Sequence, residues 1–247
     1  MKRRIFLGAA SLLLFVVFLV ALLPARVVVG WLSLPSVGLS GIEGTIWSGS
    51  AIQLSVGNTA LGSLQWENGS LGLLIGRPAW DIELERPDGF VRGHIGLRAS
   101  GHVRLQGVDA VGSLGNLEGL LPLYGTQGDV TVRIEQLRVE DNQFALIHGR
   151  IVIDKVRTNA LKSGDLGTIE LSFPGNEAAP LTGLLTTLNG PLQIRDGQVI
   201  VSAHGGYQIT GRVAPVSDAP QEIVDAMQFF GSADGEGFRQ FSQSGNY

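Results

Sequence analysis

The sequence predicts a mainly β protein, in which a one-faced antiparallel β-sheet domain with a few short helices follows a single-pass membrane anchor. Three observations predict this fold. Residues Ile5 to Leu23 are 19 uncharged residues in succession, apolar and polar residues alternate in short runs from Leu39 onward, and glycine, with 35 of 247 residues, separates those runs. A run of that length is typical of a transmembrane helix, and strict alternation is typical of half-buried strands.

The N-terminal run sets the expected topology. A helix rises about 1.5 Å per residue, so the run reaches about 28 Å and matches the hydrocarbon thickness of a bilayer. Lys2, Arg3 and Arg4 precede it, and basic residues before a first span stay in the cytoplasm. We therefore expect a cytoplasmic basic head (residues 1–4), a transmembrane signal anchor (5–23), a linker (24–38) and an exported β domain (39–247).

A cleaved signal peptide has the same outline of basic start and apolar core. The apolar core here is longer than an ordinary signal core, and Ala21, Leu22 and Leu23 provide no pair of small residues for cleavage. These two features favour an uncleaved anchor.

Composition excludes some classes of partner and of stabilising bond. The chain has 18 basic and 22 acidic residues and no cysteine; without the three basic residues of the head, 15 basic residues face 22 acidic ones. Binding to a phosphate backbone requires clustered positive charge, so we expect no nucleic-acid partner. Without disulfides, apolar burial and sheet hydrogen bonds must hold the exported domain together.

Alternation defines the predicted strands. Trp80, Ile82 and Leu84 alternate with acidic residues, and similar runs begin near Val103, Val130, Ile169 and Leu192. Aspartate followed by glycine favours tight turns, because both residues tolerate positive φ. This pattern predicts hairpin turns at Asp88-Gly89 and Asp196-Gly197.

The apolar face of such a sheet requires a cover. Apolar faces usually pack on protein, so we expect two sheets to close on each other as a sandwich, with a curved open sheet that holds a ligand as the alternative. Leucines at helical spacing predict short covering helices over Leu114 to Leu121 and Leu181 to Leu188. The segment from Pro220 to Phe230 predicts a third, with proline near its first turn and Gly231 at its end.

A weak internal duplication is also present. Gly44 to Trp47 and Leu61 to Trp66 recur, displaced by 105 positions, as Gly149 to Val152 and Leu166 to Leu171. The pattern suggests related β units over residues 39–125 and 126–247.

The sequence contains no pattern that predicts catalysis. The four histidines, His94, His102, His148 and His204, have no second ligand at metal spacing. No serine has glycine two positions away on both sides, and no phosphate-binding or dinucleotide loop is present. Asp234 to Gly237 lacks the further oxygens of a calcium loop and predicts a polar turn. We therefore expect no enzyme activity, no cofactor and no metal.

One stretch carries a pattern that is more specific than strand alternation. Residues Gly41 to Gly49, with the sequence GIEGTIWSG, follow the anchor and an early Leu-Pro-Ala. This arrangement resembles the type II secretion system protein N family. Further likeness comes, in order along the chain, from Leu64-Gln65-Trp66, Leu166-Gly167, Asn189-Gly190-Pro191-Leu192, Gly206 to Gly211, and the tail from Phe230 to Gly245. The chain departs from the family pattern at Glu236-Gly237-Phe238 and at Ile151-Val152-Ile153.

The resemblance implies an inner-membrane protein with a periplasmic domain, an accessory of the machine that exports folded proteins, and it implies no reaction. Its implied partners are the inner-membrane platform and secretin components. One hypothesis is therefore a non-catalytic protein that acts by protein contact. The alternative is a periplasmic β-groove protein that binds or transfers lipid on the apolar face of its sheet.

The candidate site residues are structural or contact positions. Trp47 and Trp66 alternate with polar neighbours and suit large core aromatics, with partner contact as the alternative. The glycines suit tight turns or close backbone approach. The full set is Gly41, Gly44, Thr45, Trp47, Gly49 and Trp66.

Overall fold

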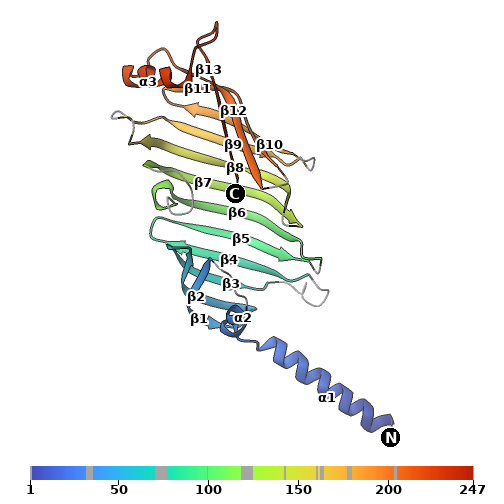
Figure 1. The fold of residues 1–247 in the computed structure, drawn as a ribbon. Coiled ribbons are helices and arrows are strands. Elements are labelled where there is room, and N and C mark those ends of the chain that lie inside the picture. Colours follow the sequence, from blue (N-terminus) through green and yellow to red (C-terminus); the bar gives the residue numbers. More distant parts are fainter. Residues whose placement is uncertain are drawn as a thin grey trace.

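The computed structural model shows one antiparallel sheet of 13 strands (Figure 1). The strands lie in the sheet in the order in which they occur in the sequence, so each pairs with its neighbours in the chain. The structure describes residues 2–31, 36–69, 77–98, 100–117, 125–141, 143–159, 161, 164–176, 180–202 and 205–246. The sheet predicted from alternation is confirmed, and it is a continuous meander.

Five helical segments accompany the strands in the described part of the chain. The helices are α1 (Lys2–Ala21), α2 (Ala25–Trp31), the 3-10 helix η2 (Leu114–Leu117), α3 (Gln221–Ala226) and the 3-10 helix η3 (Met227–Phe230). The strands are β1 (Val37–Gly44), β2 (Ser48–Val56), β3 (Thr59–Glu67), β4 (Ala79–Arg86), β5 (Gly89–Leu97), β6 (Val103–Ser113), β7 (Thr126–Glu140), β8 (Gln143–Thr158), β9 (Thr168–Pro174), β10 (Leu181–Asn189), β11 (Leu192–Val201), β12 (Gly206–Pro215) and β13 (Arg239–Asn246).

Strand register separates the two faces of the sheet. Residues directly opposite each other in an antiparallel pair point to the same face. Following the pairs from strand to strand gives one line of ten apolar residues, which we call the apolar row: Ile42, Ala51, Leu64, Leu84, Val91, Ala110, Val132, Ile151, Leu171 and Leu185. Every member is buried or half-buried.

The residues adjacent in the chain form a second line on the opposite face. This polar row is Glu43, Ser50, Gln65, Glu83, Arg92, Asp109, Arg133, Arg150 and Ser172, and it ends at Leu184. Its charges alternate in sign over β4 to β7, and Arg92 pairs with Glu83. Such cross-strand pairs stabilise a solvated face.

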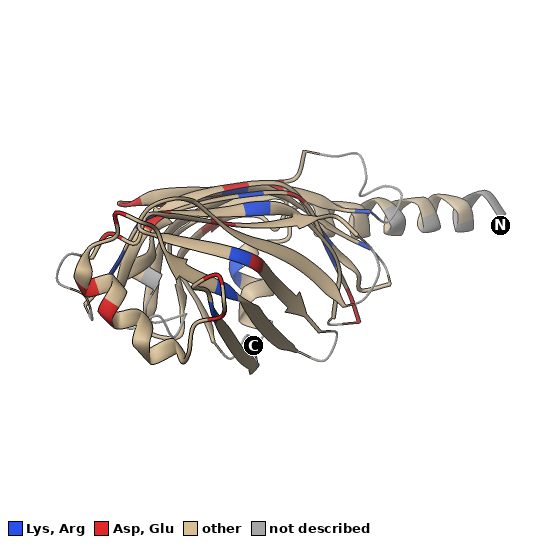
Figure 2. Cartoon of the chain, turned by 90° about the horizontal axis from the view of Figure 1, so that it is seen from above, with Lys and Arg blue, Asp and Glu red and all other residues tan. Residues whose placement is uncertain are grey.

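The predicted sandwich is wrong, because no second sheet forms in the described part of the chain. Each strand contacts its sequential neighbours, and the other substantial contacts are made by α2 with β1, η2 with β6 and β7, and η3 with β13 and α3, plus a small contact of β8 with β10. Figure 2 shows that the single sheet bends out of a plane. A meander that runs in one direction brings no distant strands face to face, so no second layer arises.

One predicted helix is confirmed and another is wrong. Residues 220–230 form α3 followed by η3, with Ile223 and Met227 buried. The segment Leu181 to Leu188 instead forms β10. A spacing of four residues fits both a helix turn and the two-residue period of a strand. In β10, Leu181 faces the apolar side, whereas Leu184 and Leu188 are exposed.

The two predicted turns differ in outcome. Asp88-Gly89 closes the hairpin of β4 and β5, where Arg86 pairs with Gly89. Asp196-Gly197 lies inside β11 at a register shift between Arg195 and Gln198, so the predicted hairpin there is wrong. Asp196 has φ 51°, and positive φ suits a β-bulge as well as a turn.

The remaining expectations concern the N-terminal region and η2. The predicted helix Leu114 to Leu121 begins as η2, and the end of the predicted helix lies outside the described residues. Residues 24–38 contain α2 and the first residues of β1. None of the helices found among the described residues has the length and apolarity needed to cross a membrane. The duplication stays a prediction.

Candidate functional site

The turn between β1 and β2 explains the glycines and threonine of the family-like stretch. Gly44 has φ 86°, and a Cβ there would overlap the carbonyl oxygen of Ser48. The Thr45 hydroxyl oxygen accepts hydrogen bonds from the backbone N–H groups of Trp47 and Ser48, both at 3.2 Å. The turn is therefore closed by Thr45 and permitted by the missing side chain of Gly44.

Three indole rings converge on this turn. The Nε1–H of Trp66 donates to the Thr45 carbonyl and that of Trp80 to the Ile46 carbonyl, both at 2.9 Å. The rings of Trp47 and Trp80 stack with centroids 6.3 Å apart and planes 4° from parallel. We call Trp47, Trp66 and Trp80 with their turn the tryptophan junction. Their N–H groups are satisfied, so the rings are held in fixed orientations.

The junction also holds the end of α1. The Nε1–H of Trp47 donates to the Val20 carbonyl at 2.9 Å, across 27 residues of sequence. Pro24 forms an isolated bridge with Thr45, and the Ile46 N–H donates to the Leu23 carbonyl at 3.1 Å. The N-terminal helix and the sheet are thus joined through side-chain and backbone bonds at one place.

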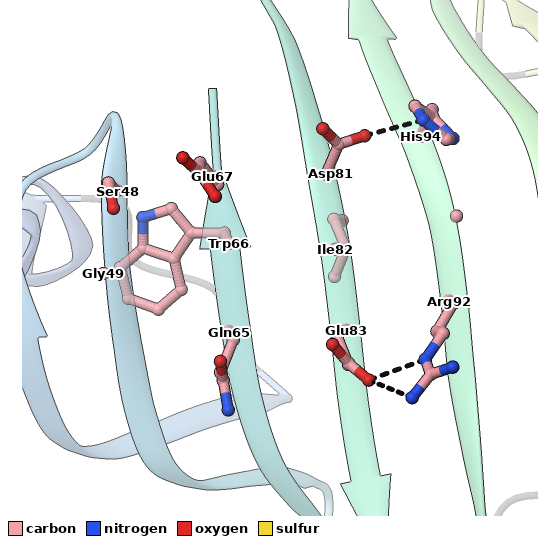
Figure 3. A pocket seen from close by; sticks show the side chains of 11 residues that line it. Ser48, Gly49, Gln65, Trp66, Glu67, Asp81, Ile82, Glu83, Arg92 and His94 are labelled. Atoms are coloured by element: carbon pink, nitrogen blue, oxygen red, sulfur yellow. Dashed lines mark hydrogen bonds and ion pairs between the residues drawn. The ribbon is translucent and has the colours of Figure 1, made fainter. Parts of the chain in front are cut away.

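Gly49 accommodates the Trp66 ring. Gly49 and Trp66 are opposite each other in β2 and β3, and a Cβ on Gly49 would lie 2.6 Å from Trp66 Cζ2. Figure 3 shows the Trp66 indole reaching from β3 toward Gly49 and Ser48 of β2. Gly41 lies apart, in β1, where it has φ 63° and faces the Ile52 side chain.

Beside the junction, β4 and β5 present charged pairs. His94 lies 2.7 Å from Asp81, and Arg92 pairs with Glu83 (Figure 3). These residues and Trp66 line a hollow of about 390 Å³. The charged side chains of the hollow are largely paired with one another, which suits a solvated binding surface more than an enclosed reaction site.

The histidines do not form a metal site in the described part of the chain. His94 pairs with Asp81, and His102 lies 3.9 Å from Glu140. His148 is exposed in β8, and His204 lies outside the described residues. Among the described residues, no group of three histidine, cysteine or acidic side chains could hold a metal ion.

A buried ion pair fixes the turn that follows β4. Arg86 bonds Asp88 at 2.9 Å, with only 10% and 18% of the two side chains exposed. Burial raises the pKa of Asp88, but hydrogen bonds from the Ser113 N–H, Asn116 and Arg86 outweigh it and lower the pKa to about 2. The carboxylate therefore ties the β4–β5 turn to the end of β6.

The tail that resembles the family forms a second cluster. Phe238 is buried beneath Arg195, whose guanidinium lies 4.3 Å from the ring centroid. Asp234 accepts the N–H groups of Phe238 and Glu236, and these bonds, with Arg212, lower the pKa of Asp234. The polar turn predicted at Asp234 to Gly237 is confirmed.

The structure brings together five of the six candidate residues, Gly44, Thr45, Trp47, Gly49 and Trp66, and leaves Gly41 outside. It adds Trp80, which the sequence indicated only as a strand residue. The available signal was the grouping of three of the four tryptophans within residues 47–80. The junction offers ring faces and satisfied donors.

Comparison with known proteins identifies the family. The family model for the type II secretion system (T2SS), protein N, matches residues 35–242. The chain belongs to the type II secretion system protein N family. It is 25% identical to the type II secretion system protein N of Vibrio cholerae, over 99% of each chain, and 28% identical to that of Aeromonas hydrophila, over 96% of each.

The protein of Pectobacterium carotovorum with the same name is 24% identical, over 99% of this chain and 98% of the relative. No solved structure matches this chain. Family membership confirms the resemblance on which the sequence expectation was based, and it supports a role in type II secretion.

Proposed function

We propose that this protein N family member is a non-catalytic inner-membrane accessory of the type II secretion system. It supports the export of folded proteins across the outer membrane through contacts of its periplasmic sheet. The observation that carries the proposal is the extent of the family match. Residues 35–242 begin just before β1 and end within β13, so the family match covers the sheet.

Attachment to the inner membrane is supported by the N-terminal sequence. The uncharged run Ile5 to Leu23 follows three basic residues. Among the side chains of α1 that the structure describes, the large apolar ones are exposed, with Phe6 at 73% and Phe15 at 62%. A bilayer would remove this surface from water, and the basic residues orient the N-terminus toward the cytoplasm.

The edges of the sheet supply contact surfaces. The end of β1 is crossed by the chain around Pro24, and Gly41 and Gly44 interrupt its regular backbone. In contrast, β13 pairs with β12 over eight successive residues, and within β13 no charged side chain follows Arg239. An unprotected edge strand accepts a further strand through its free backbone groups. We assign contact with platform or secretin components to the β13 edge.

Co-purification tests the contact role. The full-length protein, extracted from membranes in detergent, is expected to co-purify with inner-membrane platform or secretin components. Cells that lack the protein are expected to secrete less. An unrelated single-pass protein from the same membranes is the control. Recovery of the protein alone, with secretion unchanged in its absence, would contradict the proposal.

Cysteine labelling tests the topology, because the chain has no cysteine of its own. In whole cells with a permeabilised outer membrane, Ser244→Cys is expected to react with a membrane-impermeant maleimide, and Lys2→Cys is expected to react only after lysis. The wild-type chain is the blank. Equal labelling of both variants, or a mature protein that lacks its first thirty residues, would show that α1 is not an anchor.

A further inference from the structure

The apolar row crosses ten strands without a polar member. Strands lie about 4.8 Å apart, so the row is about 43 Å long. Two parallel apolar lines widen it over the central strands: Leu105, Leu137 and Ile147 on one side, and Val130, Ile153 and Ile169 on the other. The opposite face of the same strands carries the charged polar row, together with some apolar residues such as Phe90, Val111 and Val152.

No described element spans this apolar face. Apart from contacts between strands, the substantial contacts of β3 to β11 with other elements are those of η2, at one end of β6 and β7. Near that end a crevice of about 90 Å³ opens between Val91, Ala110, Val130 and Val132. An apolar surface of this extent normally faces protein or lipid, because exposure to water is unfavourable.

The N-terminal end of the row lies near the last turn of α1, the helix proposed as the membrane anchor (Figure 1). Trp66 and Trp80 project from the same face as Leu64 and Leu84, as the register of β3 and β4 shows. Trp47 stacks on Trp80 and bonds the Val20 carbonyl of α1. The C-terminal end of α1 is therefore joined, through the tryptophan junction, to the start of the apolar row.

We propose that the apolar row binds the acyl chains of a diacyl phospholipid, which enters at the tryptophan junction from the bilayer around α1. The chains lie across the strands on the apolar face, and the headgroup stays in water. Lipid binding by the sheet does not depend on the proposed role in secretion. The bilayer is the source of the phospholipid only if α1 is the membrane anchor, so this part rests on the proposed function. A protein occupant would require a matching apolar partner, whereas a bilayer supplies acyl chains at the place where the row begins.

Photo-cross-linking of the full-length protein tests the binding surface. The protein is reconstituted in phosphatidylethanolamine and phosphatidylglycerol vesicles that contain phosphatidylethanolamine with a diazirine on one acyl chain. After irradiation, mass spectrometry locates the cross-linked residues. We expect cross-links on the apolar face of β5 to β9, at positions such as Val91, Val132 and Ile151, together with cross-links on α1.

The outcomes separate the two proposals. Cross-links confined to α1 would overturn lipid binding by the sheet and leave the anchor supported. Cross-links on the sheet without any on α1 would support the binding surface and overturn the anchor. Cross-links spread equally over the polar row would show adventitious adsorption and overturn the proposal.

Two adjacent residues of β9 provide a matched pair of variants. Leu171 belongs to the apolar row and Ser172 to the polar row. A carboxylate on the apolar face must be desolvated beside an acyl chain, so Leu171→Asp is expected to lower cross-linking on β8 to β10 about fivefold or more. Ser172→Asp is expected to leave it unchanged.

Leu171→Ser is the milder variant in case Leu171→Asp does not fold, and circular dichroism checks each protein. Equal cross-linking in the folded Leu171 and Ser172 variants would overturn the proposal.

Discussion

At the scale of single residues, the stretch Gly41 to Gly49 joins the helix α1 to the sheet at the turn between β1 and β2. Gly44 and Thr45 form the turn, Gly49 leaves room for the Trp66 ring, and Trp47 bonds the Val20 carbonyl. Alternation suggested that the tryptophans were core residues. The structure shows them half-buried, with ring edges bonded to carbonyls and ring faces stacked. Their role as structural or contact positions stays a proposal that substitutions can test.

Trp47→Phe keeps an aromatic ring and removes the N–H that donates to Val20. A lost hydrogen bond of this kind costs about 1 kcal/mol, and Trp47→Ala is expected to cost about 2 to 3 kcal/mol because the ring is only half-buried. Thermal unfolding in detergent, followed by circular dichroism, measures the loss. Trp31→Phe is the control, because Trp31 is 73% exposed. An unchanged melting temperature for Trp47→Ala with lost secretion would indicate a partner contact instead.

Gly49→Ala tests the close approach of Trp66. The added Cβ would overlap the Glu43 carbonyl oxygen and lie 2.6 Å from Trp66 Cζ2. Overpacking of this kind costs about 1 to 3 kcal/mol, so a clear fall in melting temperature is expected. Gly235→Ala is the matched control, since nothing lies within 4 Å of a Cβ there. Equal melting temperatures for the two variants would contradict the packing described.

At the scale of elements, local patterns predicted which segments are helices or strands better than they predicted the shape of the sheet. β4, β6, β7, β9 and β11 form where alternation predicted strands, and α3 forms where proline and apolar spacing predicted a helix. β10 was mistaken for a helix because its leucines recur at intervals of three and four. Asp196-Gly197 was mistaken for a hairpin because its positive φ serves a bulge equally well. In both cases the sequence signal is shared by two structures, and the neighbouring strands select one.

The β4–β5 hairpin is expected to weaken in acid. The folded-state pKa of Asp88 is about 2, below the ordinary value of 3.8, so the carboxylate contributes stability above about pH 4 and loses it as pH falls toward 2. With solvent screening the contribution is about 1 kcal/mol. Asp88→Asn is expected to lower the melting temperature at pH 7 and to reduce its fall between pH 4 and pH 2.

Asp218→Asn provides the comparison for that pH series, because Asp218 is exposed. Its melting curves are expected to follow those of the wild-type protein at each pH. A fall between pH 4 and pH 2 that is as steep in Asp88→Asn as in the wild type would contradict the assignment to Asp88.

At the scale of the whole molecule, the fold is a single bent sheet with the apolar row on one face, the polar row on the other, and two unlike ends (Figures 1 and 2). The β1 end is joined to α1 and crossed by the following chain, whereas the β13 end presents a regular strand edge. The two ends therefore suit different tasks, attachment at β1 and partner contact at β13.

The double variant Ser242→Lys with Ser244→Lys tests the β13 edge. Lysine on an edge strand opposes addition of another strand, so recovery of secretion partners is expected to fall several-fold while the melting temperature stays within about 1 °C. Thr186→Lys in β10 is the control, because it is exposed on the same face but lies within the sheet. Partner recovery equal to wild type in the double variant would place the contact elsewhere.

Local patterns in the sequence predicted the β class, five of the strands (β4, β6, β7, β9 and β11) and the family, because alternation, turn chemistry and motif order are local properties. The open sheet, the position of Trp80 beside Trp47 and Trp66, and the bond between α1 and the β1–β2 turn became known from the three-dimensional structure. The physical reason is that these features depend on contacts between residues distant in the chain. The bond from Trp47 to Val20 spans 27 positions, and nothing in the pattern around either residue encodes it.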